Sequence, residues 1–303
     1  MEPLSHIEAL NRRFGVAGIA QIVPGEGGFP IVRITSPAAH AEVSLYGAQV
    51  LSWRPAGHQE ILFLSEQSHF ESGHAIRGGI PVCFPWFRGK ADNPKAPSHG
   101  FVRTREWRLD GLRADDDGSV TLVCVTSSDD STRALWPCDF LIAYRIRIAA
   151  TLRLELSVMN RGTGPLRFEE ALHTYFRIGD IHQARVRGLD AVTYLDNTDG
   201  NKSKRQDGPL ALTAPTDNAY AAEGPAEILD PVLHRRLLTE KHHSSTTIVW
   251  NPWQTGAAAL SDLGDDEWQQ MLCVEAGNIV NAAVTLAPSE EHTMRSTLSV
   301  QFE

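Results

Sequence analysis

The sequence predicts an all-β fold in which antiparallel sheets pack against each other, with one short helix near the N-terminus. Apolar and polar residues alternate with a period of two along the longer apolar segments, as in half-buried strands. Gly, Pro, Asn and Asp interrupt these segments at short intervals. No helical pattern of ten or more residues follows residue 15, except a candidate short helix near Asp230–Lys241. Many strands joined by short turns are typical of two or more packed sheets.

The predicted helix spans Ser5–Phe14. Ser5 is followed three residues later by Glu8, which is a pattern typical of a helix N-terminus. One face of this helix would carry the apolar residues Ile7, Leu10 and Phe14. After it the period changes from that of a helix to that of strands.

The clearest alternation predicts half-buried strands at Tyr144–Ile148, Leu152–Val158 and Met294–Phe302. Two further strands are expected at Ile31–Ile34 and Val120–Val125, where the buried face is less clear. Turn residues separate such segments at Pro24–Gly28, Asp115–Gly118, Asn160–Gly164, Asp199–Gly200 and Asp207–Pro209.

Two charged segments are expected in loops. Arg113–Asp117 is interpreted as the solvated tip of a hairpin. Asn201–Arg205 could reach an anionic ligand, but a flexible exposed loop is the favoured interpretation. No linker rich in Gly, Ser or Pro divides the chain, so we expect residues 1–303 to form a single domain, with residues 1–28 as its helix and lead-in.

Composition excludes several classes of protein. Of 303 residues, 42% are hydrophobic and 21% charged, which is ordinary for a globular protein, and the formal net charge of -9 argues against a nucleic-acid partner. No apolar run is long enough to span a membrane, and the N-terminal segment lacks the apolar core of a signal peptide, so we expect a cytoplasmic protein. Reduced packing cysteines are expected at Cys83, Cys124, Cys138 and Cys273.

A local basic cluster stands out against this acidic background. The segment Ala75–Trp107 combines aromatic residues, glycines and prolines with four arginines and a histidine. Guanidinium groups match the oxygens of phosphates and carboxylates, so the cluster predicts a pocket for a small anionic ligand. The basic residues are Arg77, Arg88, His99, Arg103 and Arg105.

Three further residues are candidates for acid–base chemistry or ligand binding. His173 lies in an apolar run and could transfer a proton near neutral pH, or it could be a buried histidine hydrogen-bonded to backbone. Glu275 follows apolar residues, so burial would raise its pKa and make it a usable base; the alternative is an exposed residue at a strand end. The Gly277–Asn278 pair predicts a tight turn that would place Glu275 at a sheet rim. Asp217 could accept hydrogen bonds from ligand hydroxyls, but a turn residue is favoured.

Familiar motifs for other chemistries are missing from the sequence. The phosphate-binding glycine motifs of dinucleotide and nucleoside-triphosphate sites do not occur, nor does the Gly-x-Ser-x-Gly motif of hydrolases. Neither HExxH nor paired CxxC occurs, so no metal site is expected. The remaining Arg, His, Glu and Asp residues suit acid–base chemistry on a small, anionic, hydroxylated molecule.

Six segments in order make the chain similar to the glucose-6-phosphate 1-epimerases, a branch of the aldose 1-epimerase superfamily. The resemblance runs from about Phe29 to Phe302. The matching segments are GAQVLSW (Gly47–Trp53), IRGGIPVCFPWF (Ile76–Phe87), HGFVRTREW (His99–Trp107), ALHTYFRIGDI (Ala171–Ile181), TDNAY (Thr216–Tyr220) and VEAGNI (Val274–Ile279).

This resemblance implies a large antiparallel β-sandwich, the galactose mutarotase-like supersandwich, with the site in a groove of one sheet. It implies interconversion of the α and β anomers of a hexose 6-phosphate, most simply glucose 6-phosphate, without a metal or organic cofactor. His173 matches the family's general acid and Glu275 its general base.

The resemblance also implies the substrate-binding residues. Arg77 and Arg103 match arginines that bind the substrate, including its phosphate, and Asp217 matches a carboxylate that holds sugar hydroxyls. His99 is expected to line the site. Ser98 stands where some relatives carry a glutamine that contacts the ligand, and serine is shorter. Three aromatic residues could offer an apolar face to the sugar ring: Trp86, Phe87 and Phe101. Packing between the sheets is an equally good interpretation of each.

Two alternatives stay open on the sequence alone. One is a sensor or binding protein that holds a sugar phosphate on the same fold without catalysis. The other is a glycoside-cleaving enzyme, which is disfavoured because that chemistry usually needs two carboxylates rather than a histidine and a glutamate. The expected partner is a small sugar phosphate, with no nucleic acid and no membrane, and the chain is expected to be a monomer or weak dimer.

Overall fold

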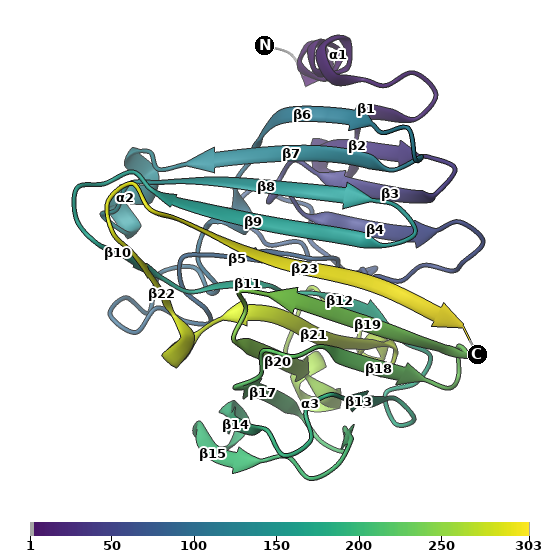
Figure 1. Cartoon of the computed structure of the whole chain (residues 1–303), viewed down its shortest axis with the longest axis vertical. Helices are drawn as coiled ribbons and strands as arrows, with labels where there is room; N and C mark the ends of the chain where they lie inside the picture. Colours follow the sequence, from purple (N-terminus) through teal and green to yellow (C-terminus); the bar gives the residue numbers. More distant parts are fainter. Residues whose placement is uncertain (1–2, 303) are drawn as a thin grey trace.

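The computed structural model describes residues 3–302, which fold almost entirely into antiparallel β-sheets (Figure 1). The prediction of an all-β fold with a short N-terminal helix is confirmed. No helix in this part of the chain has the length and apolar character needed to cross a membrane.

The largest sheet has nine strands and forms one broad face of the molecule (Figure 1). All its neighbouring strands run antiparallel. In spatial order its strands are β16 (Leu210–Ala211), β13 (Arg185–Arg187), β18 (Ala226–Asp230), β19 (Arg235–His242), β23 (Glu291–Phe302), β9 (Leu152–Asn160), β8 (Phe140–Ile148), β7 (Val120–Ser127) and β6 (Arg108–Ala114).

The second large sheet has eight strands and carries most of the candidate site. In spatial order its main path is β15 (Lys202–Arg205), β14 (Thr193–Asp196), β17 (Thr216–Tyr220), β20 (Thr246–Asn251), β21 (Met271–Asn278), β11 (Glu170–Leu172) and β5 (Val82–Cys83). Off this path, β12 (Tyr175–Arg177) also pairs with β21. Because β11 and β12 both pair with β21, the short segment between them lies beside the middle of that strand.

Two smaller sheets and short helices complete the fold. The four-stranded sheet runs in the order β1 (Ala20–Pro24), β2 (Pro30–Thr35), β3 (Ala39–Ser44) and β4 (Val50–Pro55), and the two-stranded sheet pairs β10 (Leu166–Phe168) with β22 (Val284–Leu286). The α-helices are α1 (Pro3–Phe14), α2 (Asp130–Leu135) and α3 (Trp253–Ala257). The 3-10 helices are η1 (Glu26–Gly28), η2 (Val102–Thr104), η3 (Asn197–Asp199), η4 (Glu267–Gln270) and η5 (Val280–Ala282).

The main core lies between the nine-stranded sheet and the sheets behind it. In Figure 1 the four-stranded sheet lies behind the upper part of the nine-stranded sheet. Trp53 of β4 is fully buried, and its Nε1 donates a hydrogen bond of 3.1 Å to the carbonyl of Ala149, at the turn between β8 and β9. Alternate residues such as Leu122 and Leu154 also have no exposed surface. The period-two pattern of these strands therefore marks the side that faces the core.

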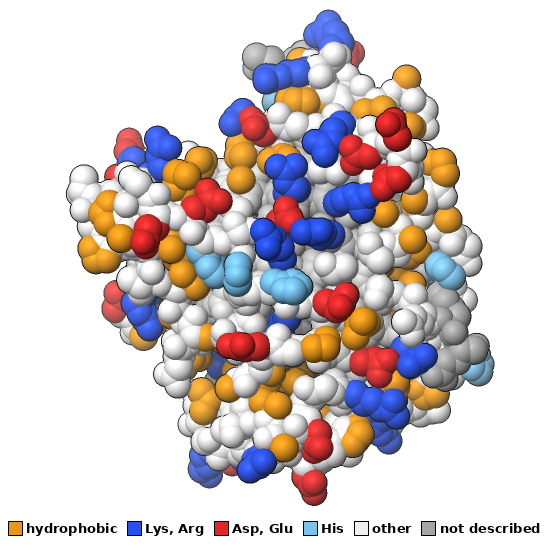
Figure 2. All heavy atoms as spheres, viewed as in Figure 1, with side chains coloured by type: hydrophobic (Ala, Val, Ile, Leu, Met, Phe, Trp, Pro, Cys, Tyr) orange, Lys and Arg blue, Asp and Glu red, His pale blue; other side chains and the backbone are white. Residues whose placement is uncertain are grey.

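The outer face of the nine-stranded sheet is polar, and Figure 2 shows Lys and Arg side chains gathered near its middle. Three arginines surround Glu155 of β9, one from β9 itself and one from each neighbouring strand, β8 and β23. Their nitrogens lie 3.6 Å (Arg145), 2.9 Å (Arg153) and 3.4 Å (Arg295) from its carboxylate oxygens. Such exposed pairs contribute little each, so this face keeps the sheet solvated rather than anchoring it.

Most local predictions are confirmed. The five predicted strands are β8, β9, β23, β2 and β7. The Arg113–Asp117 segment comprises the end of β6 and the first residues of its turn to β7. The cysteines are free, and all but the half-buried Cys138 are buried. Helix α1 begins at Pro3, two residues before the predicted start at Ser5. Residues 1–2 of the predicted lead-in and residue 303 lie outside the described positions. The side chain of Ser5 is also outside them.

Two local predictions are wrong. The candidate helix at Asp230–Lys241 is instead the end of β18, a turn, and most of β19. Alternate residues of β19 are buried there, including Arg235, Leu237 and Lys241, so tertiary pairing overrides the apparent helical pattern. The Asn201–Arg205 segment is not a flexible loop, because Lys202–Arg205 forms the edge strand β15, paired with β14.

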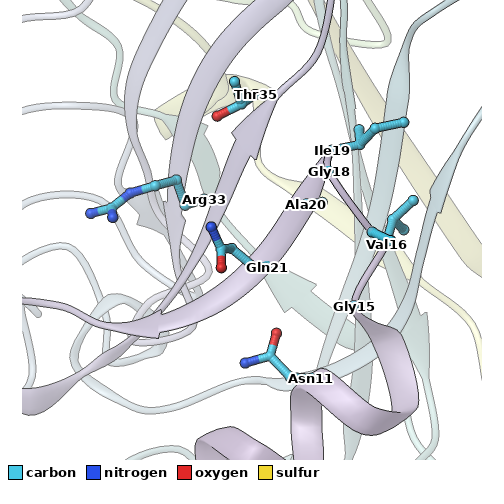
Figure 3. A pocket seen from close by; sticks show the side chains of 10 residues that line it. Asn11, Gly15, Val16, Gly18, Ile19, Ala20, Gln21, Arg33 and Thr35 are labelled. Carbon is cyan, nitrogen blue, oxygen red and sulfur yellow. The ribbon is translucent and has the colours of Figure 1, made fainter.

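A hollow between α1 and the β1–β2 hairpin is larger than the candidate site, at about 540 Å³ (Figure 3). Arg33 is the only charged residue among those that line it, and its Nε lies 2.8 Å from Glu42 in a surface ion pair. The described residues that line it include no acid–base pair. Volume alone therefore does not identify the candidate site.

Gly100 allows a close approach of two backbone segments near the site. Its φ is +74°, and a Cβ atom there would lie 1.8 Å from the carbonyl oxygen of Phe84. Gly118, at the β6–β7 turn, has a similar φ of +80° but open space around it. The two glycines therefore share a backbone conformation and differ in steric crowding.

We expect Gly118→Ala to lower the free energy of unfolding by about 1–2 kcal/mol, because only left-handed strain is introduced. Gly100→Ala should lower the free energy of unfolding by about 3 kcal/mol or more, because the backbone segments at residues 84 and 100 must also move apart. Urea unfolding of both variants tests this difference. Equal losses would show that the Phe84–Gly100 approach is not a constraint on the fold.

Candidate active site

Strand β21 forms the floor of the candidate site. All eight of its residues are buried, and alternate side chains point to opposite faces. Leu272 and Val274 pack into the main core. Glu275 lies on the other face, beside Ile248, its partner on β20. Because the strand is buried on both faces, its sequence is almost continuously apolar, with Glu275 as its one acidic residue.

The backbone pairing places His173 opposite Glu275. Leu172 of β11 pairs with Ala276, and Tyr175 of β12 pairs with Cys273, so the register runs continuously past the intervening residues. The His173 backbone N–H donates to the carbonyl of Pro81 at 3.0 Å, and its ring stacks on Tyr175 with a centroid distance of 4.7 Å. The imidazole is therefore fixed by strand pairing and by aromatic neighbours, of which Tyr175 stacks on it.

His173 and Glu275 form a buried acid–base pair. The His173 Nε2 lies 3.5 Å from the Glu275 Oε1, and the two residues are only 5% and 1% exposed. Within the described part of the chain, neither carboxylate oxygen nor the His173 Nδ1 has a hydrogen-bond partner. Buried polar groups without partners are costly, and such a concentration in one pocket is typical of a ligand site.

The surroundings shift the pKa values of this pair in opposite directions. Burial lowers the pKa of His173 well below its ordinary value, and the positive charges of Arg103 and Arg77 lower it further. Burial raises the pKa of Glu275 well above its ordinary value, and the nearby Asp217 carboxylate adds to this effect. Both shifts favour the uncharged forms of the two groups.

Three arginines form the basic wall of the pocket, and they differ in their partners. Arg77 donates to the Tyr175 hydroxyl and to Asp262, both at 3.0 Å. Arg88 pairs with Asp217, whose other oxygen accepts a hydrogen bond of 2.6 Å from Asn197.

Arg103, in η2, donates to the Ser98 carbonyl at 2.9 Å, and no ion pair of Arg103 occurs among residues 3–302. It is therefore the basic residue of this wall that is most available to an anion.

The turn that carries Ser98 and His99 closes one side of the pocket. His99 adopts a positive φ of 62°, and its backbone N–H donates to the Arg88 carbonyl at 2.7 Å. Its ring lies 5.5 Å from that of His173 and 4.6 Å from that of Phe87. Burial, followed by the charge of Arg103, lowers the pKa of His99 well below its ordinary value, so it lines the pocket as a neutral ring.

All seven residues proposed from the sequence meet at one pocket of about 320 Å³. They are Arg77, Ser98, His99, Arg103, His173, Asp217 and Glu275. Of the other candidates, Phe87 lines the pocket, whereas Trp86 and Phe101 pack in the main core. Arg105 pairs with Asp129 and does not line the pocket, so the prediction that the whole basic cluster serves one ligand is wrong for this residue.

Two sequence interpretations of the site are corrected. Gly277 and Asn278 do not form a tight turn, because both pair with neighbouring strands within β21. Glu275 therefore lies inside the sheet rather than at its rim. Asp217 belongs to β17 and pairs with Trp250 of β20, so it is not a turn residue.

Some lining residues were not predicted as site residues. Arg88 belongs to the basic cluster of the sequence, but its pairing with Asp217, far away along the chain, cannot be read from the sequence. Trp250 looks like an ordinary strand residue, yet its ring meets that of His173 edge-on at 5.9 Å. Asp262 is not itself a lining residue, but it pairs with the lining residue Arg77. It lies in an acidic loop whose composition does not indicate this pairing.

One group of potential metal ligands occurs at the pocket floor. One ligand atom each from His173, Cys273 and Glu275 lies within 4.8 Å of the others. All three residues are buried. The sequence predicts no metal site, because neither HExxH nor paired CxxC occurs in it.

Comparison with known proteins adds independent evidence. The sequence profile described as "Aldose 1-epimerase" matches residues 30–299. A Salmonella typhimurium protein named "Putative glucose-6-phosphate 1-epimerase" is 33% identical over 273 residues, covering 88% of this chain and 90% of that protein. A protein of the same name from Cenchrus ciliaris is 34% identical over 271 residues, covering 86% and 80%.

Solved structures show the same architecture. The crystal structure of a Salmonella typhimurium protein described as a "putative mutarotase (YeaD)" matches with a TM-score of 0.89 and 30% identity over the full length of both chains. A "galactose mutarotase-like protein" from Clostridium acetobutylicum matches with a TM-score of 0.75 at 16% identity, covering 94% of this chain and 98% of that one. The latter likeness concerns the fold alone.

Burial of Glu275 predicts a pH-dependent cost to stability. Because the pKa is raised in the folded state, the folded protein holds this proton at pH values where the unfolded chain has released it. Stability is therefore lost as the pH rises from the ordinary value of 4.5 through the raised pKa. Glu275→Gln removes the ionisation, and its stability relative to the parent should increase with pH by up to about 1.4 kcal/mol per unit.

Urea unfolding between pH 5 and 9 measures this difference, with the exposed Glu26→Gln as the matched control. A stability gain that does not grow with pH would mean that Glu275 is not desolvated as described.

Proposed function

The chain belongs to the aldose 1-epimerase family, and from this we propose that it interconverts the α and β anomers of a hexose 6-phosphate, with glucose 6-phosphate as the expected substrate. One observation carries the proposal: a buried histidine–glutamate pair faces the same pocket as a basic wall. The substrate class is supported by the names of relatives at 33–34% identity.

Ring opening of a cyclic hemiacetal needs one base and one acid. Glu275 would accept the proton of the C1 hydroxyl while His173 donates a proton to the ring oxygen, and the bond between C1 and the ring oxygen would break to give the open aldehyde. Rotation about the C1–C2 bond presents the other face of the carbonyl group. Reclosure returns both protons to their original groups, so the pair is regenerated without any other reactant.

Substrate binding would favour the protonated His173 and ionised Glu275 that the reaction needs. Arg103 and Arg77 help to lower the pKa of His173 after the larger effect of burial. A phosphate group bound to these arginines would offset their charges, and the pKa of His173 would rise. The proton would then move from the Glu275 carboxyl to the imidazole, which yields the protonated acid and ionised base of the proposed mechanism.

The remaining lining residues would hold the sugar. Arg103 is available to the phosphate because its bond goes to a carbonyl rather than to a carboxylate. Asp217 already accepts hydrogen bonds from Arg88 and Asn197, so it would bind sugar hydroxyls as part of a fixed polar network. Phe87 and Trp250 offer apolar surface beside the ring. Binding remote from C1 would align the anomeric centre with the catalytic pair.

Glu275→Gln should lower the rate constant for anomer exchange of glucose 6-phosphate by about 10²–10⁴-fold, because the amide cannot accept the hydroxyl proton. Exchange NMR measures the rate, and calorimetry measures whether binding is retained. Parent protein that binds glucose 6-phosphate without speeding anomer exchange would instead support the non-catalytic sensor.

Arg103→Ala should raise the KM for glucose 6-phosphate by about 10–100-fold, because a charge-assisted bond to phosphate is lost. Activity on unphosphorylated glucose should change far less. Arg105→Ala is the matched control, since Arg105 lies two residues away and pairs with Asp129 outside the pocket. Equal effects of Arg103→Ala on both sugars would argue against phosphate recognition by Arg103.

A further inference from the structure

Cys273 has no role in the proposed reaction, yet it lies next to the catalytic pair. It precedes Glu275 by two residues on β21, so both side chains leave the strand on the same face. Its register partners are Tyr175 on one side and Trp250 on the other. We propose that His173, Cys273 and Glu275 form a binding site for one divalent ion of the zinc type, which would block the catalytic pair.

The geometry is close to that of a three-ligand zinc site. Bonds of about 2.0–2.3 Å to N, O and S at tetrahedral angles place ligand atoms about 3.3–3.6 Å apart. The His173 Nε2 and Glu275 Oε1 already lie 3.5 Å apart, and the Cys273 Sγ completes a group in which no separation exceeds 4.8 Å. Side-chain rotations would have to bring all three atoms onto one ion.

The ligand atoms are free to bind an ion. Both oxygens of Glu275 are buried without hydrogen-bond partners in the described part of the chain. His173 and Glu275 line the pocket, which provides the route of entry, while Cys273 lies fully buried beside them. An ion held by these three side chains would keep a fourth position open toward the pocket, as in catalytic zinc sites.

The charges of the pocket permit a cation. Arg77 and Arg88 are each paired with a carboxylate, those of Asp262 and Asp217. Arg103 is the remaining cation of the basic wall, and Glu275 opposes it within the same pocket. Binding would also release the thiol proton of Cys273, and the resulting thiolate would add a negative charge to the ligand set.

The chemical class follows from the donors. A mixed set of imidazole, thiolate and carboxylate suits Zn²⁺ and Co²⁺, whereas Mg²⁺ and Ca²⁺ prefer oxygen donors only. A bound ion would occupy both groups that the reaction uses for proton transfer. This inhibitory consequence rests on the proposed function, but binding of the ion does not.

Titration of the full chain with Co²⁺ tests the binding directly. We expect one equivalent to bind with the near-ultraviolet charge-transfer band of a thiolate–cobalt bond, and Zn²⁺ to displace it. Cys273→Ser should abolish this band and weaken Zn²⁺ binding at least about tenfold. Cys138→Ser, which alters a half-buried cysteine elsewhere, should leave both unchanged. Binding without the band, or a band that survives Cys273→Ser, would overturn the proposal.

A second measurement separates this proposal from the proposed function. Zn²⁺ should inhibit anomer exchange by the parent protein, EDTA should restore it, and Cys273→Ser should show at least about tenfold weaker inhibition by Zn²⁺. If the parent protein binds Co²⁺ through Cys273 but never catalyses anomer exchange, the metal site stands and the proposed function fails. If exchange is catalysed but unaffected by saturating Zn²⁺, the inhibitory site is wrong.

Discussion

The antiparallel pairing of β21 with its neighbours determines where the chemical groups of the pocket lie. A continuous register past His173 puts this residue opposite Glu275, and pairing with β20 puts Ile248 on the other side of the same carboxylate. A slip of one residue would turn Glu275 into the main core and bring Val274 to the pocket. The relative position of the His173 and Glu275 side chains is therefore determined by the strand pairing.

This arrangement buries polar groups, and their desolvation lowers the free energy of unfolding. A carboxyl group and an imidazole are buried there with unsatisfied polar atoms, in a sheet whose other face belongs to the main core. The large packed sheets supply the apolar burial that offsets this cost. The pocket therefore holds several desolvated polar atoms, whereas the outer face of the nine-stranded sheet is an ordinary polar surface.

Period-two patterns were enough to predict the fold class and its longest strands, and family resemblance identified the residues that converge on the pocket. Local propensity failed where tertiary pairing decides the outcome. Gly277–Asn278 looks like a turn, but hydrogen bonds from both neighbouring strands hold it extended. In β19, adjacent Leu237 and Leu238 obscure the alternation of a strand. The pairing of Arg77 with Asp262 joins residues 185 positions apart, and only the folded topology brings them together.

The carboxylates of Asp262 and Asp217 act as internal counterions in the basic wall. Under the proposed function, a phosphate dianion would have to share Arg77 and Arg88 with them, so the attraction of these two cations for it would be moderated. For a reaction whose substrate and product differ only at one stereocentre, tight retention of either anomer would slow turnover. The two carboxylates would thus favour rapid release of substrate and product over tight binding.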